Sequence, residues 1–138
     1  MTQKNYTGGC RCGALRYDIA AEPVFMNHCQ CLDCQHLSGT GHSSYLTFPN
    51  ETLVETGEAE IRETIGDSGS IKRHGSCRIC GSPVSLTFAA MPTLFAVHAA
   101  SLDDPARFKP HVITYADRAL PWDQLDPALE RRPGLPRA

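Results

Sequence analysis

The spacing of its cysteines constrains this chain more than any other sequence feature. The seven cysteines fall into three tight groups, which are Cys10 with Cys12, then Cys29, Cys31 and Cys34, then Cys77 with Cys80. We call the first and last groups the outer pairs and the middle group the triplet. Three sulfurs within six residues are hard to explain by core packing, and such spacing is typical of metal ligands. The odd number of cysteines also fits full disulfide pairing badly.

The composition indicates one soluble globular domain. The chain has 138 residues, of which 41% are hydrophobic and 20% charged, and its aromatic content of 7% leaves room for metal to add stability. A net charge of -2 gives no sign of the basic surface that nucleic-acid binding usually needs. No run approaches the roughly 18 apolar residues of a membrane span, and the first residues show no secretory pattern. We therefore expect a cytoplasmic protein with reduced thiols.

Hydrophobic alternation predicts many short strands and almost no helix. Leu15, Tyr17 and Ile19 form a period-two pattern. Turn residues separate further expected strands at 24–28, 44–48, 52–55, 59–65, 71–74, 84–88, 94–99 and 111–115. A single helical turn is expected at 32–37. The pattern predicts a mainly β domain, a sandwich or an open folded sheet, over residues 1–129, with a frayed tail at 130–138.

Seven cysteines divide naturally into a four-ligand and a three-ligand site. Structural zinc sites take four N or S ligands, whereas catalytic sites keep three protein ligands and one exchangeable position. The triplet can wrap one ion, which leaves the outer pairs to join distant parts of the domain around a second. Spacing alone leaves open a ribbon-like site built from Cys31, Cys34, Cys77 and Cys80. A thioredoxin-like redox role lacks the βαβ context that it needs.

Three thiolates around zinc would support thiol and carbonyl chemistry. Coordination deprotonates a thiol, which makes it a nucleophile, and the ion can also polarise a carbonyl oxygen as a Lewis acid. Both routes make or break the carbon–sulfur bond of a hemithioacetal without redox change. The expected partners are therefore a small-molecule thiol and a small aldehyde.

The cysteine groups and their neighbours resemble a known family. The matching segments are 9–17, 29–34 with Ser38 and Gly39, 77–82, 101–105, and Pro121 with Trp122. The sequence is similar to the glutathione-dependent formaldehyde-activating enzyme family, also called the centromere protein V domain family. The resemblance covers nearly the whole chain.

The resemblance implies a fold, two zinc ions and an activity. The fold would be a β-tent, a mainly β arrangement of short antiparallel strands built around zinc sites. A structural zinc would be held by the outer pairs, Cys10, Cys12, Cys77 and Cys80, and a catalytic zinc by Cys29, Cys31 and Cys34. The activity would be that of a carbon–sulfur lyase, which condenses formaldehyde with glutathione to S-(hydroxymethyl)glutathione.

Two positions beside the triplet depart from the family pattern. Gln30 stands where family members often have His, and Gln35 where they often have Arg. Ser76 replaces an aromatic residue that commonly precedes the last cysteine pair. The loss of a cation near the triplet weakens the case for an anionic thiol such as glutathione.

Two histidines flank the triplet and define the rival hypothesis. His28 and His36 could supply a fourth ligand, a general base or a proton relay, since imidazole titrates near neutral pH. The alternative is that His28 points away from the metal and His36 is exposed. If either histidine closed the triplet, the protein would be a non-enzymatic, zinc-stabilised binding module.

Other polar and aromatic residues have ordinary structural interpretations. We expect Asp33 to cap the short helix and His98 to be a half-buried strand residue. His74, beside Lys72, is expected on a solvated edge. Trp122 is expected in a segment that folds back on the sheet, where it packs in the core rather than lining a substrate pocket.

Overall fold

Two β-sheets and one short α-helix make up the fold in the computed structural model, which describes residues 4–66 and 68–134. Within these residues, one sheet contains β1 (Tyr6–Gly9), β2 (Arg16–Ile19) and β5 (Val54–Thr56), in that order. The strands of the second sheet are β3 (Phe25–Cys29), β4 (Ser43–Pro49), β6 (Ala59–Ile65), β7 (Ile71–Cys77), β8 (Pro83–Phe88), β9 (Met91–His98), β10 (Val112–Thr114) and β11 (Glu130–Arg131). Their spatial order is β11-β10-β3-β4-β9-β8-β7-β6. Short 3₁₀ turns follow at Ala99–Ser101, Pro105–Arg107 and Ala116–Arg118.

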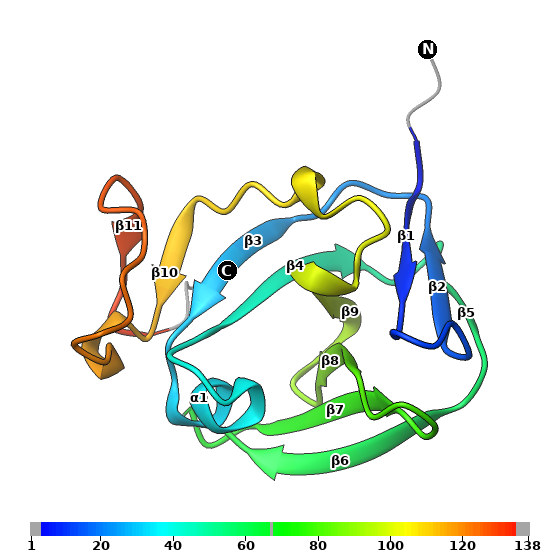
Figure 1. The fold of residues 1–138 in the computed structure, drawn as a ribbon, viewed down its shortest axis with the longest axis horizontal. Coiled ribbons are helices and arrows are strands. Elements are labelled where there is room, and N and C mark those ends of the chain that lie inside the picture. The colour runs from blue at the N-terminus through cyan, green and yellow to red at the C-terminus, as the bar shows by residue number, and fades with distance from the viewer. Residues whose placement is uncertain (1–3, 67, 135–138) are drawn as a thin grey trace.

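The larger sheet is strongly bent. In Figure 1, β3 and β4 cross the upper part of the molecule, β6 and β7 the lower part, and β9 and β8 connect them. The strand pairing is irregular between Gly75 and Ser76 on β7 and between Leu86 and Phe88 on β8. Such bulges bend a strand and increase its twist, so the curvature has a local cause in both strands. The bend leaves space on the inner side of the sheet.

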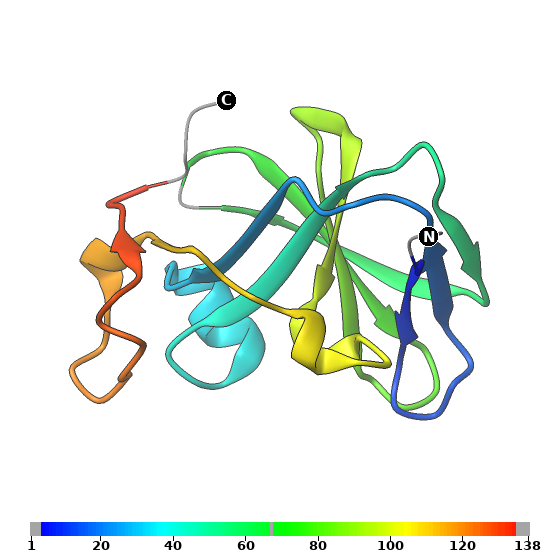
Figure 2. The ribbon, with the colours of Figure 1, turned by 90° about the horizontal axis from the view of Figure 1, so that it is seen from above.

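The smaller sheet lies at the opposite end of the molecule from β10 and β11, as Figure 1 and Figure 2 both show. A hydrophobic core joins it to one face of the larger sheet, with Ile19 of β2 packed against Leu46 and Phe48 of β4. All three side chains are completely buried, and each stabilises the fold by about 1.5–3 kcal/mol. Because side chains alternate along a strand, Tyr45 and Thr47 of β4 point to the other face.

The single helix, α1 (Leu32–Ser38), begins and ends at residues that the sequence marks. Cys31 is its N-cap, and the Cys31 sulfur accepts a hydrogen bond from the backbone N–H of Cys34 at 3.3 Å. Gly39 ends the helix with φ 74, a left-handed conformation that glycine adopts without steric cost. This confirms the predicted helical turn. It also corrects the prediction for Asp33, which lies in the first turn but is not the N-cap.

The architecture confirms the predicted mainly β fold of short antiparallel strands around cysteine groups. Two features at the C-terminal side differ from the prediction. β10 pairs in parallel, not antiparallel, with both β3 and β11. Residues 130–131 were expected in a frayed tail, but they form β11, and the N–H of Arg132 donates to the carbonyl of Ile113 at 2.9 Å. Residues 135–138 of the expected tail lie outside the described residues.

Two expectations about burial are wrong. The side chain of Trp122 is 60% exposed rather than packed in the core, because its segment is held by the neighbouring Asp123, which bonds Gln30 and His42. His74 and Lys72 are buried rather than solvated. The reason is that β7 is not an edge strand, since β6 pairs along its outer side, and alternation turns both side chains inward.

The half-buried His98, as expected from the sequence, makes the stability of the fold depend on pH. Its ring packs against Tyr45 with ring centroids 4.7 Å apart, and burial lowers the pKa of His98 to about 4. Between that value and the ordinary pKa of about 6.5, the unfolded chain binds the proton and the folded chain does not. The free energy of unfolding is therefore highest above pH 6.5 and falls as the pH is lowered towards 4.

We predict that the variant His98→Phe, which keeps an aromatic ring against Tyr45, loses this part of the pH dependence. Between pH 7 and pH 5 the wild-type protein should lose about 2 kcal/mol more stability than the variant. Urea unfolding at the two pH values measures the difference, and comparison of the two proteins cancels any loss of metal that they share. Equal losses would show that the pKa of His98 is not lowered in the folded state.

Candidate metal centres

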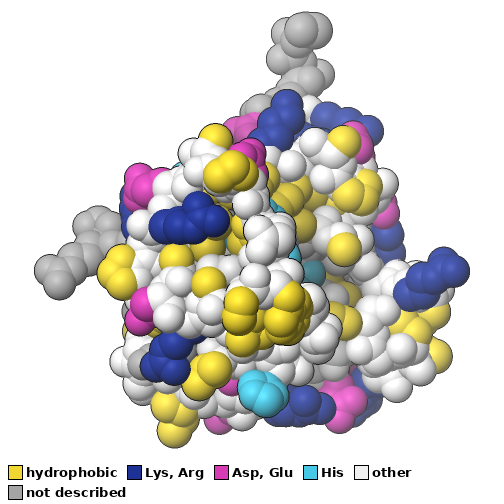
Figure 3. Space-filling view, turned by 60° about the vertical axis from the view of Figure 1, so that its left-hand side comes forward, with side chains coloured by type: hydrophobic (Ala, Val, Ile, Leu, Met, Phe, Trp, Pro, Cys, Tyr) yellow, Lys and Arg dark blue, Asp and Glu magenta, His cyan; other side chains and the backbone are white. Residues whose placement is uncertain are grey.

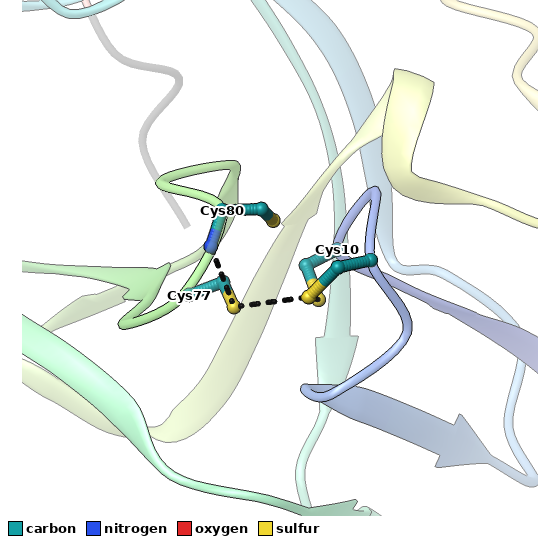
Figure 4. A group of neighbouring side chains, drawn as sticks. Cys10, Cys77 and Cys80 are labelled. Atoms are coloured by element: carbon teal, nitrogen blue, oxygen red, sulfur yellow. Dashed lines mark hydrogen bonds between the residues drawn. The ribbon is translucent and has the colours of Figure 1, made fainter.

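The outer pairs meet between two loops that are far apart in the sequence. Cys10 and Cys12 follow β1, whereas Cys77 ends β7 and Cys80 lies in the turn before β8. The four sulfur atoms lie within 4.8 Å of one another, and Figure 4 shows Cys10 facing Cys77 and Cys80 across the gap. The sulfurs of Cys12 and Cys10, and of Cys12 and Cys77, are each 3.6 Å apart. The structure therefore brings together the four cysteines expected in the closed site.

This spacing fits a metal ion rather than a disulfide. A tetrahedral ion with metal–sulfur distances of about 2.3 Å places its sulfur ligands about 3.8 Å apart, close to the observed 3.6 Å. A disulfide needs about 2.05 Å, and all seven cysteines are free thiols. The donor set, four sulfurs, is the set that structural zinc prefers.

Backbone N–H groups point at the sulfurs of the outer pairs. Leu15 donates to the Cys10 sulfur at 3.2 Å, and Ile79 donates to the Cys77 sulfur at 3.3 Å. Gly13, with φ 86, allows the loop after Cys10 to turn back in this way. A hydrogen bond from Ser82 lowers the pKa of Cys80 to about 5. Such bonds favour the thiolate, which is the form that binds metal.

The triplet forms a second, separate sulfur group. Cys29 ends β3, Cys31 caps α1, and Cys34 lies in the first turn of that helix. Their sulfurs lie within 4.8 Å of one another and the three residues are at most 5% exposed. Hydrogen bonds with Cys31 and Cys34 lower the pKa of Cys29 to about 3, so the group carries a thiolate at neutral pH. Both groups could hold a metal ion.

Within residues 4–66 and 68–134, no fourth His, Cys, Asp or Glu joins the triplet. His28 shares a hydrogen bond with Ser44 at 2.7 Å, and its ring packs against those of His42 and Phe108. It therefore occupies the face of β3 opposite to Cys29. His36 is exposed on α1. Neither flanking histidine closes the group, which leaves the triplet with three protein ligands.

Gln30 and Gln35 anchor the chain, and Gln30 does so from a buried position. Gln30 donates to the carboxylate of Asp123 at 3.0 Å. Gln35 donates to the backbone carbonyls of Gln30 and Arg118, both at 2.9 Å. The two glutamines tie the triplet loop to the segment that follows β10.

Lys72 is a candidate site residue that the sequence analysis did not single out. Its ammonium nitrogen lies 3.7 Å from the Cys31 sulfur and 3.7 Å from the Asp33 carboxylate. Burial lowers the pKa of Lys72, but the nearby charges of the three thiols and Asp33 raise it, and the net shift is upward. Lys72 thus remains a cation beside the triplet. The signal available in the sequence was the alternation along 71–77, which places Lys72 on the same face as His74.

A cavity of about 310 Å³ opens beside the triplet, on the inner side of the bent sheet. The described polar residues that line it are Asn27, Cys29, Cys34, Tyr45, Thr47, Lys72 and Tyr115. The hydroxyl of Tyr45 lies 3.7 Å from the Cys34 sulfur, and burial raises the pKa of this phenol well above its ordinary value. Tyr45 therefore keeps its proton and can donate a hydrogen bond into the cavity. Thiols, a cation and a phenol meet at one end of a single space.

The comparisons with known proteins agree with this arrangement. The family model for the glutathione-dependent formaldehyde-activating enzyme matches residues 5–118, and the chain belongs to that family. A crystal structure of a Rhodobacter sphaeroides protein is similar in fold, with a TM-score of 0.55 and 20% sequence identity. The likeness covers 70% of this chain and 87% of that one. None of the curated protein sequences is significantly similar to this chain.

The outer surface mixes charges of both signs. On the face shown in Figure 3, basic and acidic side chains lie scattered around a central group of hydrophobic ones. In the part of the chain that the structure describes, no helix is long and apolar enough to cross a lipid bilayer. The concentrated chemistry of the molecule therefore lies in its two sulfur groups and the cavity.

We predict two zinc ions per chain, of which the ion at the outer pairs stabilises the fold and the ion at the triplet does not. Cys77→Ser should abolish folding or lower the melting temperature sharply, because structural zinc contributes on the order of 10 kcal/mol in small domains. Cys34→Ser should keep the fold and reduce the zinc content from two ions to one. Elemental analysis with thermal unfolding tests both variants. A single zinc in the wild-type protein would contradict the assignment of two sites.

Proposed function

We propose that the protein is a zinc-dependent carbon–sulfur lyase that joins a thiol and a small aldehyde as a hemithioacetal. The outer pairs would hold the structural zinc and the triplet the catalytic one. The observation that carries the proposal is a group of three buried thiols beside a cavity, which no fourth His, Cys, Asp or Glu joins among residues 4–66 and 68–134. The family suggests formaldehyde and glutathione as the substrates, in a reaction of the S-(hydroxymethyl)glutathione synthase type.

The triplet suits a catalytic zinc because three thiols supply the ligands and leave one position for an exchangeable group. Bound there, zinc would keep the thiols ionised and would act as a Lewis acid towards a carbonyl or lower the pKa of a substrate thiol. Three thiolates and one divalent cation leave a net charge of -1. Lys72, 3.7 Å from Cys31, offsets that charge inside the protein.

The reaction needs a proton to move from sulfur to oxygen. The thiol sulfur adds to the carbonyl carbon, the carbon–oxygen double bond becomes a single bond, and the oxygen takes up the proton that the thiol releases. Tyr45 keeps its proton at neutral pH and lies beside Cys34. Its hydroxyl can stabilise the negative charge that develops on the oxygen, and the Lys72 ammonium adds a second positive influence at the same end of the cavity.

Lys72 also bears on the choice of thiol. Gln30 and Gln35 do not line the cavity, so their replacement of the family's histidine and arginine removes no cation from its wall. Lys72 lines it instead, and it provides one positive group for an anionic thiol or for an oxyanion. A reducing compartment such as the cytoplasm would keep the seven free thiols in the form that the proposal requires.

We predict that Tyr45→Phe lowers the rate of hemithioacetal formation by about 10²-fold, as loss of one oxyanion donor does in other enzymes. The ring and its packing on His98 are retained, so the fold should survive. Exchange between formaldehyde and S-(hydroxymethyl)glutathione, followed by NMR, gives the rate. The matched control is Tyr17→Phe. Tyr17 is a buried tyrosine that shares a hydrogen bond with Ser101 in the core between the two sheets, and its replacement should leave the rate unchanged.

The same assay separates the enzyme from the binding module. If protein loaded with two zinc ions gives no acceleration over buffer with formaldehyde and glutathione, a reaction of the S-(hydroxymethyl)glutathione synthase type is excluded. If other thiols and aldehydes also fail to react, the lyase proposal is wrong and a zinc-stabilised binding module remains. If Tyr45→Phe is as active as the wild type, the lyase can stand, but the oxyanion role of Tyr45 is wrong. Circular dichroism of each variant shows whether a lost rate reflects chemistry or folding.

A further inference from the structure

The cavity beside the triplet has two chemically different ends. Polar groups gather around Cys29 and Cys34, as described above. The remaining wall is largely hydrocarbon. Leu86, Phe88 and Ala96 pack against the triplet itself, and Phe25, Met91 and Leu94 are among the apolar lining residues outside that cluster. These side chains come from β3, β8 and β9, on the inner side of the bent sheet. A molecule that fills the cavity must therefore place a reactive group at one end and an apolar group at the other.

The size of the cavity exceeds what formaldehyde needs. An apolar cavity of about 150 Å³ is large enough to bind benzene, and this one has about 310 Å³. Formaldehyde, with one carbon and one oxygen atom, would leave most of the hydrocarbon wall uncovered. The wall can stabilise a bound molecule only if that molecule carries apolar surface of its own.

The charged groups of the lining also restrict which molecules the cavity can bind. Among the described residues that line the cavity, the Lys72 ammonium is the one cationic side chain, and it already lies 3.7 Å from both Cys31 and Asp33. Glutathione carries two carboxylates and one ammonium group. None of these described lining residues is an Asp or Glu that could pair with that ammonium, and the thiolate of the triplet would repel both carboxylates. Burial of unpaired charges is costly, so the cavity as a whole does not suit glutathione.

We propose that the cavity holds the aldehyde, and that this aldehyde carries an uncharged apolar substituent of about five to seven carbons, a short alkyl chain or a phenyl ring. The proposal rests on the lyase activity proposed above and names the substrate class of the same site. The carbonyl oxygen would face Tyr45 and Lys72, and the substituent would lie among Phe88, Met91 and Leu94. A thiol then adds to the carbonyl carbon, with its proton ending on the oxygen, as for formaldehyde.

The test compares aldehydes of increasing length with one thiol. Zinc-loaded wild-type protein is mixed with 2-mercaptoethanol and formaldehyde, propanal, butanal, pentanal or hexanal, and kcat/KM for hemithioacetal formation is measured by NMR exchange. Burial of each methylene should raise kcat/KM about fourfold, or about 50-fold from propanal to hexanal. Equal values for propanal and hexanal, with formaldehyde converted, would overturn the inference and leave the lyase activity standing.

Two variants test whether the dependence of kcat/KM on aldehyde length arises in the cavity. Met91→Trp enlarges a side chain at the rim of the cavity, where Met91 is 38% exposed and can change without disrupting the core. It should lower kcat/KM for hexanal at least tenfold. The matched control is Ile61→Trp, an exposed apolar residue on β6 that does not line the cavity, and it should have no effect. Equal effects of the two variants would contradict the assignment of the cavity.

A binding measurement keeps the inference testable apart from catalysis. 1-Hexanol and 1-propanol are unreactive alcohols that carry the same chains, and NMR titration of the zinc-loaded protein gives their dissociation constants. Hexanol should bind about 50-fold more tightly than propanol, with shifts at Leu86 and Leu94. If no aldehyde reacts but hexanol binds in this way, the lyase proposal fails and the apolar preference of the cavity stands. If hexanol binds no more tightly than propanol, the inference is wrong.

Discussion

Repulsion between buried thiolates is the constraint on which the rest of this structure depends. The three sulfurs of the triplet lie within 4.8 Å of one another and are almost completely buried, so they cannot all ionise without positive charge nearby. Without such charge the ionisation is shared unequally, since the pKa of Cys29 falls to about 3 and that of Cys34 rises. Lys72 supplies one positive charge, and a divalent cation would allow all three thiols to act as thiolates.

The location of the triplet follows from the way in which the larger sheet uses its two faces. Because side chains alternate along β4, Leu46 and Phe48 pack in the core shared with the smaller sheet, whereas Tyr45 and Thr47 line the cavity. Alternation along β3 likewise turns Cys29 towards the cavity. The bulges of β7 and β8 bend the sheet around that face. A metal ion held by the outer pairs would fasten β1 to the β7–β8 turn, and would thus fix the frame in which the triplet is placed.

Local sequence patterns were sufficient for most of the strands and for the short helix, because these depend on turn residues and on the alternation of side chains, but no strand was expected at β1. Spacing left two partitions of the cysteines open, and the family resemblance favoured the one that the structure brings together. The role of Lys72 could not be predicted, since it depends on the bend that carries β7 towards α1. Trp122 was misplaced because its hydrophobicity suggested core packing, whereas the polar contacts of Asp123 hold that segment. The short β11 carries almost no pattern of its own.

The central claim is that one sulfur group is closed by four cysteines and the other leaves a position for a non-sulfur ligand. Zinc X-ray absorption spectroscopy of the wild-type protein with two bound ions measures this directly, because sulfur and lighter ligands lie at different distances from zinc. The account predicts an average of about 3.5 sulfur atoms per zinc, with the remaining coordination made up by oxygen or nitrogen at about 2.0–2.2 Å. An average of four sulfur atoms per zinc, with no lighter ligand, would contradict it.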